Sequence, residues 1–346
     1  MNARPLVVRF GALGDMALLT VLIRHLSQRF GQPVDVVSSG PWTRPLLESQ
    51  PGVGNLYVIG SRNLPYWLSR DQQQLVHLLR TRGAGPTWLC DHYHNEKTFM
   101  LLQRAGWSPQ HWCQHFGFTD LRGTHFCDLW LRYAYRNPPL LGGADLPCTA
   151  TDAFPQLLVS DTQQHDCAAW LATHGLDNKK LILIQAGNKR TMRKFGLRQR
   201  SSNSKYWPEN NWAAVLRGLR ELHPDHAMVM LGVPSEAALN DDIVRNAAIA
   251  GAYNLAPEMN IAKLMALCAR ADGMISVDTG PAHVAAAIGC PVLTLFGKAD
   301  PAMYAPRGPN ARVRCLTGRY HGEVSMLGIE PRSVIAEWQL LMSTSP

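Results

Sequence analysis

The sequence contains no long apolar run and no paired-cysteine motif. Its longest apolar stretch, MALLTVLI, stops at Arg24, well short of the ~18 residues that a membrane-spanning helix needs. It also lacks the basic and apolar pattern, with a cleavage site, of a secretory signal. We therefore expect a cytoplasmic protein. The eight cysteines include no CxxC pair, which predicts reduced and mostly buried thiols.

Charged residues are also scarce, at 17% of the chain, and acidic ones are the scarcer kind. The low charge and the 46% of hydrophobic residues exclude a disordered chain and provide for a large core. A length of 346 residues favours two domains over one. The formal net charge of +8 favours an acidic partner, such as a phosphorylated lipid, a nucleotide or a nucleic acid.

Short apolar runs alternate with amphipathic helical patterns along the whole chain. Strands are predicted at 6–10, 34–37, 87–90, 181–187, 227–232, 273–277 and 291–296. Strand–helix alternation in both halves is typical of two doubly wound parallel sheets, an α/β fold. Ligands of such sheets sit at the carboxyl ends of the strands, so we expect a site in a cleft between two domains. A final helix from Pro331, with a stripe from Val334 to Met342, either covers its own domain or crosses to the first.

The segment GALGD (11–15) lies between the first strand and the first helix. Its glycines, Gly14 included, permit a tight turn and the close approach of a ligand, and a helix N-terminus attracts anions. Asp15 has two interpretations. It is either a favoured cap of a helix that starts near Met16 or a carboxylate with a chemical role. It is not part of a Walker A loop, because no GK[ST] follows.

The segment SVDTGPAHVAAAIG (276–289) follows a strand and opens a helix of small residues. Asp278 or Thr279 can cap this helix, Gly280 removes side-chain bulk at its N-terminus, and His283 lies in its first turn. This arrangement suits a diphosphate held by backbone N–H groups and the helix dipole. The alternative is a well-capped core helix.

Two further segments in the second half bear residues suited to a nucleotide. Lys205 in KYWPENNWAAVL precedes a helix and is placed to reach a phosphate, although an isolated lysine is usually only solvated. Glu236 in LGVPSEAAL follows a strand, as does the acid that binds ribose hydroxyls in nucleotide-binding folds. Alternatively, Glu236 is a first-turn acid that interacts favourably with the positive end of its own helix dipole. Residues 188–205 bear seven Lys or Arg and no acid, which is typical of a solvated basic loop or of a cover for a polyanion.

The segment CDHYHNEK (90–97) also follows a predicted strand. We interpret His92, His94 and Lys97 as contacts to an acceptor, with solvent-exposed surface residues as the alternative. A metal site is disfavoured, because this segment and the downstream His111, Cys113 and His115 fit no tight structural zinc spacing.

Two of these segments together resemble a known family. RFGALGDMALLTVLIRHLSQRFG and ADGMISVDTGPAHVAAAIGCPVLTLFGKADPAMYAP are similar, in order and separation, to the N-terminal and C-terminal signatures of the ADP-heptose:lipopolysaccharide heptosyltransferases, glycosyltransferase family 9. KYWPENNWAAVL and LGVPSEAAL resemble two shorter segments of that family. The resemblance extends over nearly the whole chain.

The resemblance implies a GT-B architecture of two Rossmann-like domains that face a cleft. We expect an acceptor domain at 1–165, a nucleotide-sugar domain at 178–328, and a helix at 329–346 that returns to the first domain. It implies inverting transfer with no obligatory metal and no cofactor. By resemblance, Asp15 is the catalytic base. The donor-binding residues are Gly14, Lys205, Glu236, Asp278, Thr279, Gly280 and His283.

The implied partners are an ADP-heptose-like donor and a phosphorylated lipopolysaccharide core acceptor, with peripheral contact to an anionic membrane surface and no nucleic acid. Two departures from the family pattern bear on substrate identity. Residues 189–204 form a basic insertion, and Asp91-His92-Tyr93-His94 stands where the family has Asp-x-Gln-Gly. The alternatives are transfer to another acceptor, a nucleotide-sugar epimerase and a nucleic-acid-binding protein. A dehydrogenase is disfavoured by the lack of GxGxxG after a strand.

Overall fold

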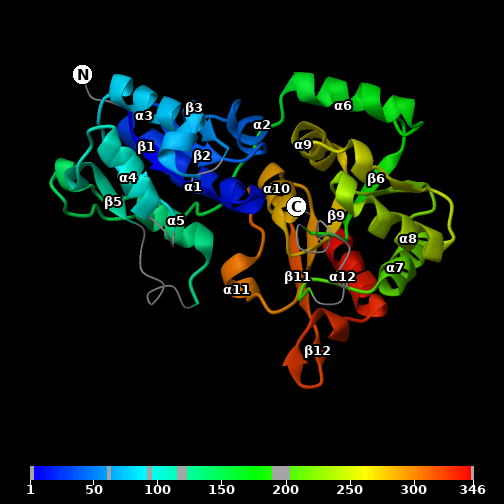
Figure 1. Cartoon of the computed structure of the whole chain (residues 1–346). Helices are drawn as coiled ribbons and strands as arrows, with labels where there is room; N and C mark the ends of the chain where they lie inside the picture. The colour runs from blue at the N-terminus through cyan, green and yellow to red at the C-terminus, as the bar shows by residue number, and fades with distance from the viewer. Residues whose placement is uncertain (1–3, 61–63, 92–95, 115–122, 189–202, 344–346) are drawn as a thin grey trace. The chain divides into compact units, whose positions relative to one another are not determined.

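The computed structural model describes residues 4–60, 64–91, 96–114, 123–188 and 203–343. The chain divides into two compact units, Met1–Leu157 and Leu158–Pro346 (Figure 1). The boundary therefore falls eight residues before the expected end of the first domain at 165. Helix α6 (Asp161–Thr173) accounts for the difference, because it packs on α9 (Ile261–Arg270) of the second unit.

The first unit contains a five-stranded parallel sheet in the order β3-β2-β1-β4-β5. The strands are β1 (Leu6–Val8), β2 (Val34–Ser39), β3 (Val53–Ile59), β4 (Thr87–Leu89) and β5 (Trp112–Gln114). The helices are α1 (Leu13–Phe30), α2 (Thr43–Leu47), α3 (Arg70–Arg82), α4 (Glu96–Arg104) and α5 (Phe126–Ala134), with 3-10 turns at Tyr66–Leu68, Pro109–His111 and Pro139–Leu141.

Alternation along the strands divides this core into two layers. Leu6 and Val8 of β1 join the cluster that α3 and α4 cover, whereas α1 and α5 pack against each other outside that cluster. Because successive side chains of a strand point to opposite faces, the sheet has helices on both faces, as a doubly wound fold requires. The predicted strand at 6–10 is two residues too long, since β1 ends at Val8.

The second unit contains a six-stranded parallel sheet in the order β11-β10-β9-β6-β7-β8. Its strands are β6 (Lys180–Gln185), β7 (His226–Met230), β8 (Ala252–Asn254), β9 (Gly273–Val277), β10 (Val292–Phe296) and β11 (Val313–Thr317), beside a small hairpin of β12 (Arg319–Tyr320) and β13 (Glu323–Val324). The other helices are α7 (Glu209–Leu222), α8 (Ala237–Ala247), α10 (Gly280–Ile288), α11 (Pro301–Tyr304) and α12 (Pro331–Ser343), with 3-10 turns at Pro234–Glu236, Ala256–Glu258 and Met326–Gly328.

The last helix, α12, buries its apolar stripe within the second unit. Val334, Trp338 and Leu341 are at most 1% exposed and belong to the cluster beneath α7 and α8. The indole N–H of Trp338 lies 3.0 Å from His223 Nε2. The stripe therefore covers its own domain, and the return of this helix to the first domain stays a prediction.

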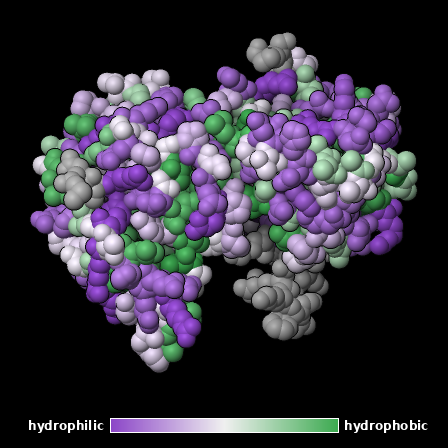
Figure 2. Space-filling view, turned by 90° about the horizontal axis from the view of Figure 1, so that it is seen from above, coloured by the Kyte–Doolittle hydropathy of each residue, from purple (hydrophilic) through white to green (hydrophobic). Residues whose placement is uncertain are grey.

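Within the described residues, no helix is both long and apolar enough to cross a membrane. The face shown in Figure 2 is mostly hydrophilic, with smaller hydrophobic patches between the polar residues. All eight cysteines are free thiols, and five of them are buried.

Candidate active site

Asp15 lies in the first turn of α1, close behind β1. The helix begins at Leu13 and not near Met16, because Ala12 is the extended N-cap residue (φ −73°, ψ 175°). The Asp15 carboxylate caps the helix from its third position, where Oδ2 accepts a hydrogen bond of 2.8 Å from the Ala12 N–H. Its other oxygen, Oδ1, accepts one of 3.1 Å from Arg9 Nη2. The side chain nevertheless stays 41% exposed, so a capping role leaves one edge of the carboxylate open to a reactant.

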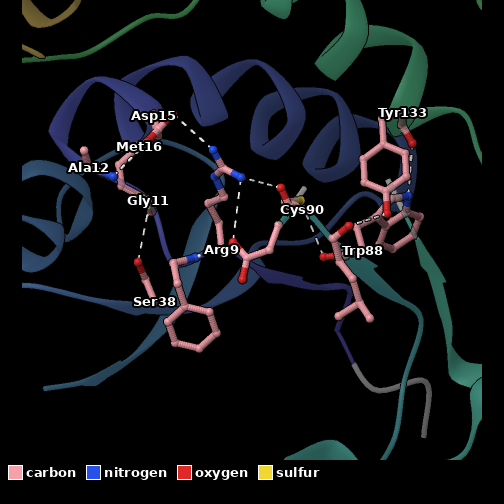
Figure 3. A network of polar contacts seen from close by, with 12 residues as sticks. Arg9, Gly11, Ala12, Asp15, Met16, Ser38, Trp88, Cys90 and Tyr133 are labelled. Carbon is pink, nitrogen blue, oxygen red and sulfur yellow. Dashed lines mark hydrogen bonds and ion pairs between the residues drawn. The ribbon is translucent and has the colours of Figure 1, made fainter. Parts of the chain in front are cut away.

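Arg9 connects this carboxylate to the neighbouring strand (Figure 3). Its Nη1 donates to the Cys90 carbonyl at 2.6 Å and lies 3.7 Å from Asp91 Oδ1. Asp91 Oδ1 in turn accepts the Phe10 N–H at 2.9 Å. The Arg9 and Asp91 side chains are only 8% and 5% exposed. Burial of both charges is tolerable because each has a partner of opposite sign.

Strand order explains why these residues meet. The chain passes from β1 to β2 on one side of the sheet and later returns to β4 on the other side of β1. Loops that leave β1 and β4 therefore diverge, and such a switch point at the carboxyl ends of strands is where α/β sheets bind ligands. Arg9 and Asp91 are the residues just beyond these two strands, and Asp15 follows in the next helix.

The second unit repeats this geometry. Its first strand, β6, lies between β7 and β9, so the switch point brings together residues 186–188 and 278–280. Asp278 follows β9, its N–H donates to the Leu295 carbonyl at 3.0 Å, and it is 7% exposed. Thr279 is the extended N-cap residue of α10, and Gly280 is the first helical residue.

The first turn of α10 thus has the features of an anion site. Pro281 lies in the first turn of α10, where the missing N–H of proline costs the helix no hydrogen bond. His283 lies in the same turn and is 7% exposed. The positive end of the α10 dipole favours a phosphate at this N-terminus.

Lys205 reaches this helix from the segment before α7. Its Nζ lies 2.6 Å from Asp278 Oδ2 and donates to the Asp278 carbonyl at 2.7 Å, with 32% of the side chain exposed. Asn203 orients the lysine, since its Oδ1 accepts the Lys205 N–H at 3.1 Å and its Nδ2 donates to Asn188 Oδ1 at 3.0 Å. Lys205 is therefore a fixed cation at the α10 N-terminus and not a solvated surface lysine.

Glu236 follows β7 in the turn Pro234–Glu236 and is 4% exposed. Its Oε2 accepts the Val233 N–H at 2.9 Å. Burial raises the pKa of this carboxyl, and hydrogen bonds from Val233 and the Gln185 side chain oppose that rise. A Cβ at Gly187 would lie 2.6 Å from Glu236 Oε1, and one at Gly232 would lie 2.8 Å from Oε2. Glycine at both positions therefore makes the space for the carboxylate.

The remaining predicted residues are less informative. Gly14 is buried in the first turn of α1 in the first unit, whereas the other predicted donor residues belong to the second. Lys97 is exposed in the first turn of α4, and His92 and His94 lie outside the described residues. Among the residues that the structure does describe, no cluster of three or more His, Cys, Asp or Glu side chains is placed to hold a metal ion.

Sequence reasoning missed Arg9, Gln185 and the Asn188–Asn203 pair. Arg9 was absorbed into the predicted strand at 6–10, although a charged residue at the end of an apolar run is itself a signal of a strand's carboxyl end. Asn188 and Asn203 bracket the basic segment, and only the fold brings their side chains together.

Three comparisons with known proteins show what the chain is similar to. A model of the family described as glycosyltransferase family 9 (heptosyltransferase) matches residues 161–327. The chain is 24% identical to lipopolysaccharide heptosyltransferase 2 of Salmonella typhimurium over 98% of each chain. It is 31% identical to lipopolysaccharide heptosyltransferase 3 of Escherichia coli, over 85% of this chain and 82% of the relative. The structure of E. coli ADP-heptose lipopolysaccharide heptosyltransferase II has a TM-score of 0.73 and 20% identity, over 99% and 98% of the two chains.

The two Rossmann-like α/β domains have the GT-B architecture. The similarities to heptosyltransferases identify the chain as a glycosyltransferase. The chain belongs to glycosyltransferase family 9, the heptosyltransferases.

Proposed function

We propose that this enzyme is an inverting heptosyltransferase that moves a heptose, or a related sugar, from an ADP-sugar donor to a lipopolysaccharide core acceptor. The observation that carries the proposal is the Asp15 carboxylate, which two hydrogen bonds hold at a switch point while 41% of its side chain stays exposed. The relatives' names supply the donor and acceptor class.

Asp15 suits the role of general base. In a single displacement the acceptor oxygen attacks the anomeric carbon, the bond from that carbon to the diphosphate oxygen breaks, and ADP leaves. The acceptor hydroxyl proton passes to the Asp15 carboxylate. Each of its oxygens accepts one hydrogen bond, Oδ1 from Arg9 and Oδ2 from Ala12, and a carboxylate oxygen has two lone pairs. Room remains for one more hydrogen bond, from the acceptor hydroxyl.

The second unit supplies the chemistry for the donor. The diphosphate gains negative charge as the bond to the sugar breaks. The N-terminus of α10 at Thr279 and Gly280, with His283 in the same turn and Lys205 beside Asp278, places partial and full positive charge where that group would bind. Glu236 is proposed to accept a hydrogen bond from a ribose hydroxyl, as an acid beyond a strand does in other nucleotide folds.

The acceptor is a phosphorylated lipid in this proposal, so the enzyme works at an anionic membrane surface. Lys97 is exposed at the start of α4 and would contact the acceptor together with His92 and His94. The net charge of +8 favours such a surface, where each nearby basic residue contributes about 1 kcal/mol. Around the 3-10 turn Tyr66–Leu68, Trp67 and Leu68 are 74% and 58% exposed, which provides apolar side chains for the interface.

The deciding experiment measures ADP release from ADP-heptose, with and without heptose-deficient lipopolysaccharide. Acceptor-dependent release, with an acceptor mass gain of one heptose, supports the proposal. Release with a soluble acceptor instead would assign another substrate in the same family, and conversion of the donor alone would assign an epimerase. Tight nucleic-acid binding with a steep salt dependence and no ADP release would refute an enzymatic role.

Asp15→Asn tests the base. Because a positioned base contributes ~10²–10⁴-fold in rate, turnover should fall by about that factor while ADP binding is retained. Asp71→Asn is the matched control, since Asp71 also lies in the first turn of a helix in the same unit and accepts a backbone N–H, from Gly60 at 2.8 Å. Unchanged turnover in Asp15→Asn would remove Asp15 as the base.

A further inference from the structure

We propose that Arg9 is the positioning residue of the transfer reaction: it fixes the direction of the Asp15 carboxylate without touching substrate. The inference rests on the proposed role of Asp15 as base. It concerns a side chain that the sequence motifs did not single out, and the first argument for it is the geometry of its guanidinium.

The two terminal nitrogens of Arg9 have separate tasks. Nη2 donates to Asp15 Oδ1 at 3.1 Å, whereas Nη1 donates to the Cys90 carbonyl at 2.6 Å and lies 3.7 Å from Asp91 Oδ1. The guanidinium is planar, so fixing one nitrogen also fixes the direction of the other. The backbone just beyond β4 therefore sets the position of the hydrogen-bond donor that Asp15 meets.

Burial separates Arg9 from the reactants. Its side chain is 8% exposed, against 41% for Asp15, and its guanidinium carbon lies 5.7 Å from the centroid of the Trp130 ring. A side chain enclosed in this way affects the reaction through the carboxylate it holds. Figure 3 shows the arrangement, with Arg9 between Asp15 on α1 and Cys90 beyond β4.

The cluster around Arg9 contains one cation and two carboxylates. One guanidinium faces two carboxylates, at 3.1 Å for Asp15 and 3.7 Å for Asp91. The three side chains together have a formal charge of one negative unit. Arg9 is therefore shared between Asp15 and Asp91. Arg9 thus orients the base, while the Cys90 carbonyl and Asp91 hold the other side of the guanidinium.

Gly11 makes the close approach possible. A Cβ at this position would lie 2.6 Å from the Asp15 Cβ and 3.1 Å from Arg9 Nε. Any side chain here would push Asp15 from its place against Arg9. The glycine before α1 therefore serves the pair of side chains as well as the turn.

Arg9→Lys is the primary test, because lysine keeps the buried positive charge opposite Asp91 but has one nitrogen in place of the fork. We expect kcat to fall by ~10–100-fold, the order of loss that a misplacement of about 1 Å causes. The KM for the donor and the Kd for ADP should stay within about twofold of wild type, since the proposed donor residues other than Gly14 belong to the second unit. Arg9→Gln, which also removes the charge, should lose at least as much kcat.

Arg82→Lys is the matched control. Arg82 is likewise 8% exposed, its Nε lies 2.7 Å from the buried Asp35 carboxylate, and its guanidinium carbon lies 5.6 Å from the centroid of the Trp107 ring. Its substitution should lower the free energy of unfolding about as Arg9→Lys does, yet leave kcat unchanged. Equal kcat losses in the two lysine variants, at equal loss of stability, would overturn the proposal.

A double-mutant cycle with Asp15→Asn completes the test. If Arg9 acts through Asp15, Arg9→Lys causes no further loss of kcat in the Asp15→Asn background. A full second loss there would overturn the inference, as would wild-type kcat in Arg9→Lys alone while Asp15→Asn is impaired. If Asp15→Asn itself turns over normally, the proposed base fails, and the positioning role of Arg9 fails with it.

Discussion

Glu236→Gln should separate ligand binding from stability at one buried carboxylate. Burial is the main cause that raises the pKa of Glu236 above its ordinary value of 4.5. A carboxyl with a raised pKa in the folded state contributes stability that is fully present below 4.5 and is lost as pH rises through the folded value. Wild-type stability therefore contains a term that declines as pH rises above 4.5. Glutamine has no charge to bury, so the variant lacks this decline.

The cost of the substitution should appear in ADP binding. Glutamine keeps the volume of the side chain and one carbonyl oxygen, which can still accept the Val233 N–H that now lies 2.9 Å from Oε2. It cannot offer a charged acceptor to a ribose hydroxyl. Hydrogen bonds to charged groups contribute about 1.5–3 kcal/mol, so the Kd for ADP should rise by about 10- to 150-fold.

The assay is calorimetric titration with ADP at neutral pH, together with urea unfolding from pH 4.5 upward. Glu258→Gln is the control with the opposite sign. Glu258 is exposed, and hydrogen bonds from Trp170 (2.7 Å) and His174 (3.3 Å) lower its pKa. Its contribution to stability is present above 4.5 and is lost as pH falls through the lower folded value. This control should be less stable at neutral pH, with ADP affinity unchanged.

Two results would refute the reasoning about Glu236. Wild-type affinity for ADP in Glu236→Gln would limit Glu236 to bracing the turn at 233–236. If the stability of Glu236→Gln declines with rising pH as that of wild type does, burial of this carboxylate is not the source of the pH dependence.

Two further predictions concern the N-terminus and the packing of α10. Lys205→Met should raise the Kd for ADP at least ~10-fold by the loss of a charged contact, and adding Asp278→Asn should recover part of it, because Lys205 also neutralises that carboxylate. If calorimetry shows no recovery in the double variant, repulsion by Asp278 plays no part. Gly308→Ala should destabilise the protein by about 1–3 kcal/mol in urea unfolding, because the new Cβ would lie 1.6 Å from the Ala286 carbonyl oxygen of α10. An unchanged urea midpoint would contradict this packing argument.

The sequence predicted the sheet strands with buried, continuous apolar runs best. The prediction for 273–277 matches β9 (Gly273–Val277), and Pro331 does begin α12. Short or half-exposed strands gave no such signal. Most residues of β3 (Val53–Ile59) are half-buried, and β8 (Ala252–Asn254) is only three residues long. Their pairing depends on neighbours in the sheet, which local patterns do not encode.

The site was predictable as far as single segments determine it. A strand-to-helix turn that contains glycine and a carboxylate predicts a helix N-terminus beside an acid. Both α1 and α10 begin in this way, and α10 also has a proline in its first turn. The interpretation of Asp15 as the N-cap predicts a start near Met16, three residues after the observed start of α1 at Leu13. The carboxylate instead reaches back from the third helical position to Ala12, an arrangement that the residue type alone does not distinguish from an N-cap.

The sequence did not predict the side-chain contacts between segments that lie far apart along the chain. Arg9 meets the Cys90 carbonyl 81 positions away, and Lys205 meets Asp278 73 positions away. Both contacts exist because the strand order places the return strand beside the first strand, and that order follows from the packing of helices on both faces. A pattern that spans a dozen residues contains no information about such a pairing.

The two switch points are alike in topology but differ in charge, and this contrast fits the two halves of one transfer. In the first unit, one guanidinium is shared by two carboxylates, which leaves negative charge on an exposed oxygen-bearing group. In the second, an ammonium faces one carboxylate at the positive end of a helix dipole. Proton removal from an acceptor hydroxyl needs the former, and a departing diphosphate needs the latter. In the proposed mechanism, the same fold element provides a base in one unit and an anion site in the other, by a change of a few side chains just beyond the strands.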